Sequence, residues 1–315
     1  QVHDIGLHMV KNAEGDVGFE VLVGGGLGRT PVIGKVIRKF LPKQDLLTYL
    51  EAILRVYNMN GSRDNKYKAR IKILVNALGA EEFTKLVEAE WEIIRSTELA
   101  LTDDYVEKIK GFFEPHPYAS DAVDGLAVLG NQLADNQEFN AWYERNTREH
   151  KIAGYRAVVI SLKPHLKPPG DITDNQLDAV ADLADTYNFG EIRSTHDQNL
   201  VFAHVAAGDL YTLWQSLRDL NLARANIGTL TDMIVCPGFD FCSLANAHTL
   251  TVADQINAKF DDLDYLYDIG DIKLNMSGCI NACAHHHVAH IGVLGVDKGG
   301  EDFYQITLGG SSRED

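Results

Sequence analysis

The sequence is poor in positive charge, and it has no long apolar run. Its 315 residues contain 29 Lys and Arg against 45 Asp and Glu, which gives a formal net charge of −16. A protein that binds nucleic acid or a membrane surface carries a basic footprint, so we expect neither partner here. No apolar stretch approaches the roughly 20 residues that a membrane-spanning helix needs. No secretory signal opens the chain, so we expect a cytoplasmic protein.

Cysteine is also scarce. Four cysteines in a chain of this length are too few for a disulfide scaffold. The rest of the composition is that of a folded protein, because 45% of the residues are hydrophobic and 23% are charged. This length and composition are enough for two or three packed units.

Two similar hairpins are predicted near the two ends of the sequence. The first has alternating strands over 5–10 and 19–23 and runs into Gly24-Gly25-Gly26. The second has strands over 291–296 and 303–308 and runs into Gly309-Gly310. The two stretches match in order, which indicates an internal repeat whose period is close to the whole chain. On that interpretation the chain is a fragment; a coincidence between two hairpins is the alternative.

Between the hairpins, the spacing of apolar residues predicts a mixed α+β fold. Helices are predicted over 46–57, 70–77, 81–94, 104–113 and 136–145. A strand over 155–162 follows, then a helix that begins at Thr173 with Gln176 in a capping box and ends at Gly190. Strands over 191–195 and 200–205 and a helix over 210–219 complete a β-α-β-β-α order. This order favours a ferredoxin-like unit over 151–228.

All four cysteines fall into two pairs. Cys236 and Cys242 form a C-x5-C pair, and Cys279 and Cys283 form a C-x3-C pair after 36 intervening residues. Four thiolates can ligate an iron–sulfur cluster. They can also hold a structural zinc ion, alone or with one histidine of His285-His286-His287, or they can be unrelated buried thiols. The spacing alone leaves these three alternatives open.

This cysteine pattern resembles that of the sirohaem-dependent sulfite and nitrite reductases. The segment Asn275-Met-Ser-Gly-Cys279-Ile-Asn-Ala-Cys283 is similar to the family's cluster segment. Gly24-Gly-Gly-Leu-Gly-Arg29-Thr-Pro31 resembles its first-lobe glycine loop, and the stretch 190–199 resembles a strand and turn of its ferredoxin-like half. A nucleotide-binding glycine loop is rejected, because no ribose-binding acidic residue follows at the right place.

The resemblance implies a fragment of a pseudo-twofold repeat that lacks the amino-terminal half and the carboxy-terminal end. Residues 1–112 would be the remainder of the first lobe and 113–150 a helical connection. Residues 151–228 would be a ferredoxin-like half-domain, and 229–315 a second lobe that carries the cysteines. We therefore expect the isolated chain to be inactive and to lack its cofactors when purified.

The resemblance also implies cofactors and a reaction. Cys236, Cys242, Cys279 and Cys283 would ligate a [4Fe-4S] cluster, and Cys283 would also share its thiolate with the iron of a sirohaem. The reaction would be the six-electron reduction of sulfite to sulfide or of nitrite to ammonia, with ferredoxin or a flavoprotein as electron donor. The cysteine segment with its histidine run is more similar to bacterial assimilatory sulfite reductase haemoproteins.

A basic segment is the candidate for the sirohaem carboxylates, because Arg and Lys bind carboxylates through charge-assisted hydrogen bonds. Asn281, between two cysteines, is a candidate for tuning the cluster, with a turn or capping role as the alternative. A solvated helix face is the alternative for the basic segment. The candidate cofactor-binding residues are Arg29, Arg63, Asn65, Lys66, Lys68, Arg70, Lys72 and Asn281.

Two other classes of protein compete with the reductase. One is a binding module without redox chemistry that a zinc ion at the four cysteines stabilises. The other is an interaction protein that keeps the fold without cofactors. Analysis for iron, acid-labile sulfide and zinc distinguishes the first of these from the reductase.

Overall fold

The computed structural model describes residues 1–315 except 98, 165–166, 261 and 313–315. The chain divides into two compact units, residues 1–114 with 311–315, and residues 115–310. Each unit combines sheets with helices, so the predicted α+β class is confirmed. Among the described residues, no helix combines the length and the apolar character that crossing a membrane requires.

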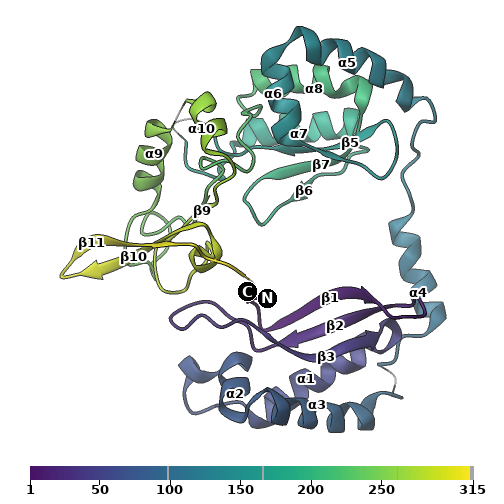
Figure 1. Ribbon diagram of the computed structural model, residues 1–315, viewed down its shortest axis with the longest axis vertical. Coiled ribbons are helices and arrows are strands. Elements are labelled where there is room, and N and C mark those ends of the chain that lie inside the picture. The colour runs from purple at the N-terminus through teal and green to yellow at the C-terminus, as the bar shows by residue number, and fades with distance from the viewer. Residues whose placement is uncertain (98, 165–166, 261, 313–315) are drawn as a thin grey trace. The chain divides into compact units, whose positions relative to one another are not determined.

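The first unit is a three-stranded antiparallel sheet in the order β1-β2-β3, with helices packed on one face (Figure 1). Its core joins Val21 and Leu41 of the sheet to Tyr49, Phe83 and Trp91 of the helices. Its elements are β1 (Ile5–Lys11), β2 (Val17–Val23), β3 (Lys35–Pro42), α1 (Leu46–Asn60), α2 (Ile71–Leu78), α3 (Ala80–Ile94) and α4 (Asp103–Lys110).

The second unit begins with a four-stranded antiparallel sheet in the order β4-β5-β7-β6, covered by helices (Figure 1). The predicted β-α-β-β-α order is present as β5-α7-β6-β7-α8, and β4 pairs with β5 at the edge of the sheet. The elements are α5 (Gly125–Asp135), α6 (Gln137–Asn146), β4 (Thr147–Glu149), β5 (Tyr155–Ile160), α7 (Asp174–Tyr187), β6 (Arg193–Ser194), β7 (Leu200–Ala206) and α8 (Leu210–Asp219).

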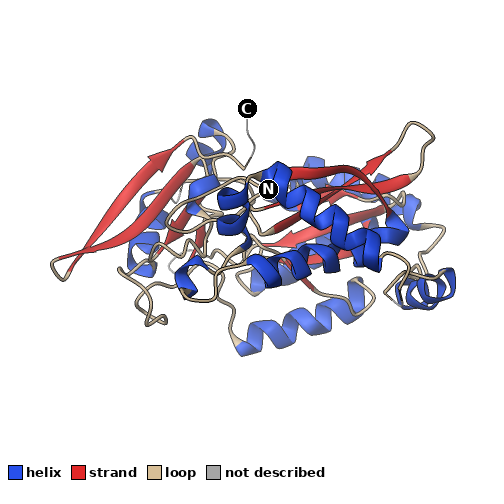
Figure 2. Cartoon of the chain, turned by 90° about the horizontal axis from the view of Figure 1, so that it is seen from below, coloured by secondary structure: helices blue, strands red, loops and turns tan. Residues whose placement is uncertain are grey.

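A second sheet in the same unit has the order β11-β10-β9-β8. Its strands β8, β9 and β10 run parallel, and β11 is antiparallel to β10. Figure 2 shows the β10–β11 hairpin extending away from the other elements of this unit. The elements are β8 (Ile234–Val235), α9 (Leu250–Lys259), α10 (Leu263–Ile269), β9 (Leu274–Ser277), β10 (Ile291–Lys298) and β11 (Glu301–Leu308).

The two predicted hairpins form, and both are closed by the same backbone hydrogen bond. The amide of Gly24, just after β2, donates to the carbonyl of Asp4, just before β1, at 2.9 Å. The amide of Gly309, just after β11, donates to the carbonyl of His290, just before β10, also at 2.9 Å. Both glycines have a positive φ, +77° and +74°, which other residues rarely adopt.

The glycine that follows each of these, Gly25 or Gly310, has no room for a side chain. A Cβ on Gly25 would collide with the carbonyl of His3, and a Cβ on Gly310 would collide with the carbonyl of Ala289. These carbonyls precede β1 and β10 by the same number of residues. Matching hydrogen bonds, dihedral angles and steric contacts favour an internal repeat over coincidence.

Most predicted elements have the predicted limits within a few residues. The helix over 210–219 is α8, and Thr173 and Gln176 form the predicted capping box at the start of α7. Two predictions were too long, because α4 ends at Lys110 with a 3-10 turn after it, and only Arg193–Ser194 of the predicted strand over 191–195 pairs. Four longer elements were not predicted, namely β3, α5, α9 and α10.

A buried ion pair joins the segment after β5 to the segment before β8. The side chain of Lys163 is fully buried, and its Nζ lies 3.1 Å from Oδ1 of Asp232 and 2.7 Å from the carbonyl oxygen of Asp197. Burial lowers the pKa of Lys163, while Asp232 acts against that shift. The ammonium group therefore depends on Asp232 for compensation of its lost hydration.

We expect Asp232→Ala to reduce the free energy of unfolding by about 3–5 kcal/mol, because it leaves a buried charge without its partner. The folded-state pKa of Lys163 lies below its unfolded value, so stability rises with pH between the two values. The deficit should therefore shrink as pH rises toward the ordinary lysine pKa. Urea unfolding at several pH values measures both effects. Asp197→Ala is the control, since Asp197 bonds Lys163 through its backbone and its carboxylate raises the pKa of Lys163 less than Asp232 does; an equal loss there would contradict the interpretation.

Candidate functional site

Two short parallel strands bring the two cysteine pairs to one edge of a sheet. β8 ends directly before Cys236, and β9 ends two residues before Cys279. Val235 pairs with Met276, and the amide of Cys236 donates to the carbonyl of Met276 at 2.9 Å. Because parallel strands have their carboxyl ends at the same edge, the loops that carry the cysteines leave the sheet side by side.

Two glycines allow these loops to touch through their backbones. A Cβ on Gly278 would lie 2.8 Å from the Cα of Gly238 and 3.2 Å from the carbonyl oxygen of Ala247. Gly238 itself has a φ of +61°. The amides of Asn246 and Ala247 donate to the carbonyl of Gly278 at 2.8 and 3.2 Å. Larger residues at 238 or 278 would force the loops apart.

The loop around Cys283 has an unusual backbone. Ala282 and His285 both have a left-handed φ, +57° and +56°, a conformation that costs energy for residues other than glycine. The amide of His285 donates to the carbonyl of Ala282 at 2.8 Å. From β9, Nδ2 of Asn275 donates to the carbonyl of Ala284 at 2.7 Å. These hydrogen bonds fix the turn that positions the Cys283 thiol.

The structure brings the four cysteines together as free thiols. Cys279 is buried, Cys283 is exposed, and Cys236 and Cys242 are partly buried. Burial raises the pKa of Cys283, and the charges of the other three thiols raise it further. Such mutual repulsion makes four thiolates unfavourable by themselves. A cationic inorganic centre between them would reverse the balance, as ligand thiolates require.

The thiols are less closely grouped than the ligands of one tetrahedral zinc ion. Zinc–sulfur bonds of about 2.3 Å would place tetrahedral sulfur ligands about 3.8 Å apart. In the part of the chain that the structure describes, the cysteines form no group with all ligand atoms within 4.8 Å of one another, and neither do the histidines at 285–287. His286 is buried, and burial first and His287 second lower its pKa to about 4.

Asn281 and several apolar side chains are exposed on the cysteine loops. Asn281 is exposed between Cys279 and Cys283. Phe241, Leu244 and Ile280 are exposed on the same loops. The exposed position of Asn281 leaves its amide available to a ligand, so its predicted tuning role stays a prediction.

The candidate basic residues lie in the first unit, where Arg70 and Lys72 bind other parts of the same unit. Arg70 makes a two-pronged ion pair with Asp4, with Nε–Oδ1 at 3.0 Å and Nη2–Oδ2 at 2.8 Å. Lys72 is buried, and its Nζ donates to the carbonyls of Leu27 and Thr30 at 2.9 and 2.8 Å. Lys72 therefore holds the glycine-rich loop in place, which is a structural role that the spacing in the sequence did not indicate.

The other basic candidates differ in their freedom to bind a ligand. Nη2 of Arg63 donates to the carbonyl and to Oδ1 of Asn58, both at 3.1 Å. Asn65 caps the following 3-10 turn, where Oδ1 accepts from the amide of Tyr67 at 2.9 Å. Arg63 and Arg70 are exposed but bind Asn58 and Asp4. The other exposed cations among the candidates, Arg29, Lys66 and Lys68, are suited to an anionic ligand of the first unit.

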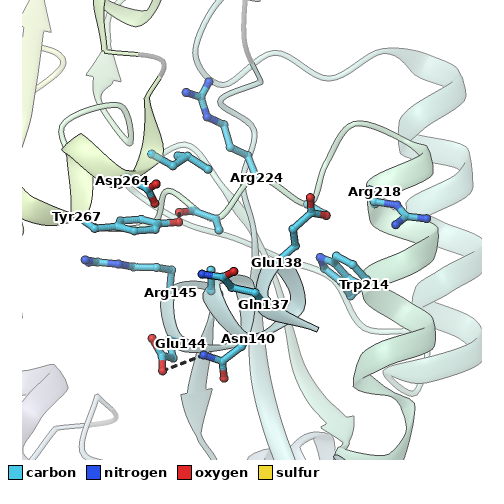
Figure 3. A pocket seen from close by; sticks show the side chains of 14 residues that line it. Gln137, Glu138, Asn140, Glu144, Arg145, Trp214, Arg218, Arg224, Asp264 and Tyr267 are labelled. Atoms are coloured by element: carbon cyan, nitrogen blue, oxygen red, sulfur yellow. Dashed lines mark hydrogen bonds between the residues drawn. The ribbon is translucent and has the colours of Figure 1, made fainter. Parts of the chain in front are cut away.

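Two features of the second unit were not predicted from the sequence. One is a cavity of about 680 Å³ between α6, α8 and α10 (Figure 3). Arg145 crosses it toward Tyr267, with its guanidinium 4.9 Å from the ring centroid and 2.6 Å from Asp271. No cysteine lines this cavity. The other feature is a cluster of histidines with Glu191, whose members are far apart in sequence and carry no motif.

Comparison with protein families gives two matches. The family model described as "Nitrite and sulphite reductase 4Fe-4S domain" matches residues 1–94. The model described as "Nitrite/Sulfite reductase ferredoxin-like half domain" matches residues 162–220. The four cysteines lie outside both matches, so their assignment depends on the geometry described above.

Curated relatives and solved structures agree with these matches. The chain is 27% identical to "Sulfite reductase [ferredoxin] 2" of Mycolicibacterium paratuberculosis over its whole length, and it covers 51% of that protein. It is 26% identical to "Ferredoxin--nitrite reductase" of Synechococcus elongatus, with 94% of the chain and 51% of the relative covered. The structure of the Mycobacterium tuberculosis NirA protein matches 98% of the chain and 50% of NirA, with a TM-score of 0.70 and 24% identity, which shows the fold alone. The chain thus spans about half the length of these relatives.

We expect Gly278→Ala to disrupt the cysteine site, since its Cβ would lie 2.8 Å from the Cα of Gly238. Overpacking of this kind costs about 1–3 kcal/mol. Thermal unfolding should show the loss of stability, and iron bound per chain after anaerobic reconstitution should fall. The control is Gly130→Ala in α5, where the new Cβ meets nothing within 4 Å. Equal iron content in both variants would show that close backbone contact is not needed.

Proposed function

Because the chain belongs to the nitrite and sulfite reductase family, we propose that it is part of an oxidoreductase that reduces sulfite or nitrite. The relatives named above are reductases of sulfite and of nitrite, and both names include ferredoxin. We propose ferredoxin as the electron donor. We favour sulfite as the substrate, because the Cys279 segment is similar to that of bacterial sulfite reductase haemoproteins.

One observation carries this proposal: four free thiols lie together at the carboxyl ends of β8 and β9. We propose that Cys236, Cys242, Cys279 and Cys283 hold a [4Fe-4S] cluster. The donor set fits, since each iron of such a cluster takes one thiolate. When bound, the cluster would supply electrons for reduction of the anion.

The four thiols differ in a way that supports separate roles. Cys279 is buried, so its sulfur can serve only a group inside the site. Cys283 is exposed, and the turn held by Asn275 fixes its position. An exposed thiol can also reach a second metal group, which supports the proposal that Cys283 bridges the cluster and the iron of sirohaem.

Sirohaem enters the proposal through the family resemblance. We propose that exposed cations of the first unit, Arg29, Lys66 and Lys68, contribute hydrogen bonds to its carboxylates. Arg70 can contribute if it exchanges Asp4 for a ligand carboxylate. Arg63 and Lys72 instead position Asn58 and the glycine-rich loop, respectively.

Anaerobic reconstitution with iron and sulfide tests the cluster directly. We expect about four iron and four sulfide ions per chain, with loss of most of this content in Cys279→Ser. Ser243→Ala is the control, because Ser243 is exposed directly after Cys242 and carries no thiol. Bound zinc without sulfide would instead support the zinc-stabilised module.

In the full-length enzyme, Cys283→Ser should abolish reduction of the anion; normal turnover would refute the bridging role.

Retention of haem by the full-length enzyme tests the role of Arg70. If Arg70 binds a sirohaem carboxylate, Arg70→Ala should lower the ratio of haem absorbance to protein. Asp4→Ala should preserve or raise that ratio, because it releases Arg70 from its ion pair. If Arg70 only ties β1 to α2, both variants should lose haem to the same extent, and the ligand role would be wrong.

A further inference from the structure

A compact group of metal-ligand side chains lies in the ferredoxin-like part of the second unit, apart from the cysteines in sequence. Nε2 of His116 is 3.1 Å from Oε2 of Glu191, and Nε2 of His204 is 3.9 Å from the same oxygen. One ligand atom from each residue lies within 4.8 Å of the others. A zinc ion bonded to nitrogen and oxygen at about 2.0–2.2 Å needs ligand atoms about 3.3 Å apart. The separation of 3.1 Å is close to that value, and the separation of 3.9 Å is longer, so binding would draw His204 toward Glu191.

The imidazole of His204 is oriented for such a role. Arg193 Nη2 lies 3.3 Å from Nε2 of His204, and a guanidinium has only donors, so Nε2 presents a lone pair. The other nitrogen, Nδ1, lies 3.1 Å from both the Tyr118 hydroxyl and Nε2 of His150. Nδ1 then carries the proton and donates to one of these groups. Histidine ligands usually have this second hydrogen bond, which fixes the ring and its tautomer.

The other two side chains are also held in place. The ring of His116 stacks on Phe189 at a centroid distance of 4.8 Å and an angle of 5°. Asn188 accepts a hydrogen bond from the amide of His204 at 2.6 Å, and its side chain donates to the carbonyl of Glu191. The turn after α7 is thereby tied to β7. Ligands fixed by packing and hydrogen bonds bind an ion with little loss of conformational entropy.

The charge of Glu191 and the protonation state of His204 are suited to the binding of a cation. Burial raises the pKa of Glu191, but hydrogen bonds from Arg193 and His116 outweigh it and lower that pKa overall, so the carboxylate is anionic. Burial first, and then the positive charges of its neighbours, lower the pKa of His204, which favours the neutral imidazole. The positive charge of Arg193 opposes the binding of a metal ion at Glu191. Its side chain is 56% exposed, so it can turn into solvent when another cation binds Glu191.

We propose that His116, Glu191 and His204 form a binding site for one divalent transition-metal ion, which competes with Arg193 for Glu191. Two imidazoles and one carboxylate are a ligand set that zinc(II) accepts, and they leave a fourth position open. The ion links the segment before α5, the turn after α7 and strand β7. Binding therefore stabilises the ferredoxin-like part of the chain.

The test is calorimetric titration of the full chain with zinc chloride. Because cysteine thiolates are also zinc ligands, all four are first changed to serine, and circular dichroism checks the fold. One zinc ion should bind per chain. Glu191→Gln and His204→Gln should each weaken that binding by at least about tenfold. His196→Gln is the matched control, because His196 is 87% exposed in the same domain and pairs only with Asp197 among the contacts described.

Arg193→Met gives a prediction in the opposite direction. Removing the competing guanidinium should tighten zinc binding, which a misfolded variant could not do. If the serine variant does not fold, the wild-type cysteines are kept, and His204→Gln should bind one zinc ion fewer than the unchanged chain. Unchanged affinity in Glu191→Gln and His204→Gln, or no tightening in Arg193→Met, would overturn the proposal and leave the cluster as a hydrogen-bond network.

Discussion

The cysteine site depends on the parallel pairing of β8 with β9. Only two residues of β8 take part, yet this pairing sets both cysteine loops at one edge of the sheet. The loops then meet through Gly238 and Gly278, where a side chain on either would collide with backbone. The chemistry of the thiols therefore rests on a backbone contact that involves no sulfur, and the sulfur positions follow from it.

The two units divide the chemistry between them. The four cysteines lie in the second unit, whereas the candidate basic residues lie in the first, and several of these maintain its own structure. A buried lysine such as Lys72 can shape a loop by binding carbonyls, but it then has less capacity for an external anion. A basic segment thus contains both ligand candidates and structural residues, and the contacts of each side chain distinguish them, since Arg63 is exposed and yet bonded to Asn58.

Elements with strong local signals could be predicted from the sequence, and so could the grouping of the four cysteines. The capping box at Thr173 and the apolar stripe of α8 are local, so they could be recognised. β8 and β9 were too short for periodicity, and Lys35, Arg38 and Lys39 interrupt the apolar pattern of β3. The group of His116, Glu191 and His204 could not be predicted, since only the tertiary fold brings such distant residues together.

The matching closure of the β1–β2 and β10–β11 hairpins has a consequence for how such a protein changes over evolutionary time. After a gene segment is duplicated, side chains that perform chemistry are free to diverge between the copies. The glycines at 24, 25, 309 and 310 lack that freedom, because backbone geometry excludes larger residues at each of them. On the internal-repeat interpretation, the two copies therefore keep their resemblance at the positions with the smallest side chains.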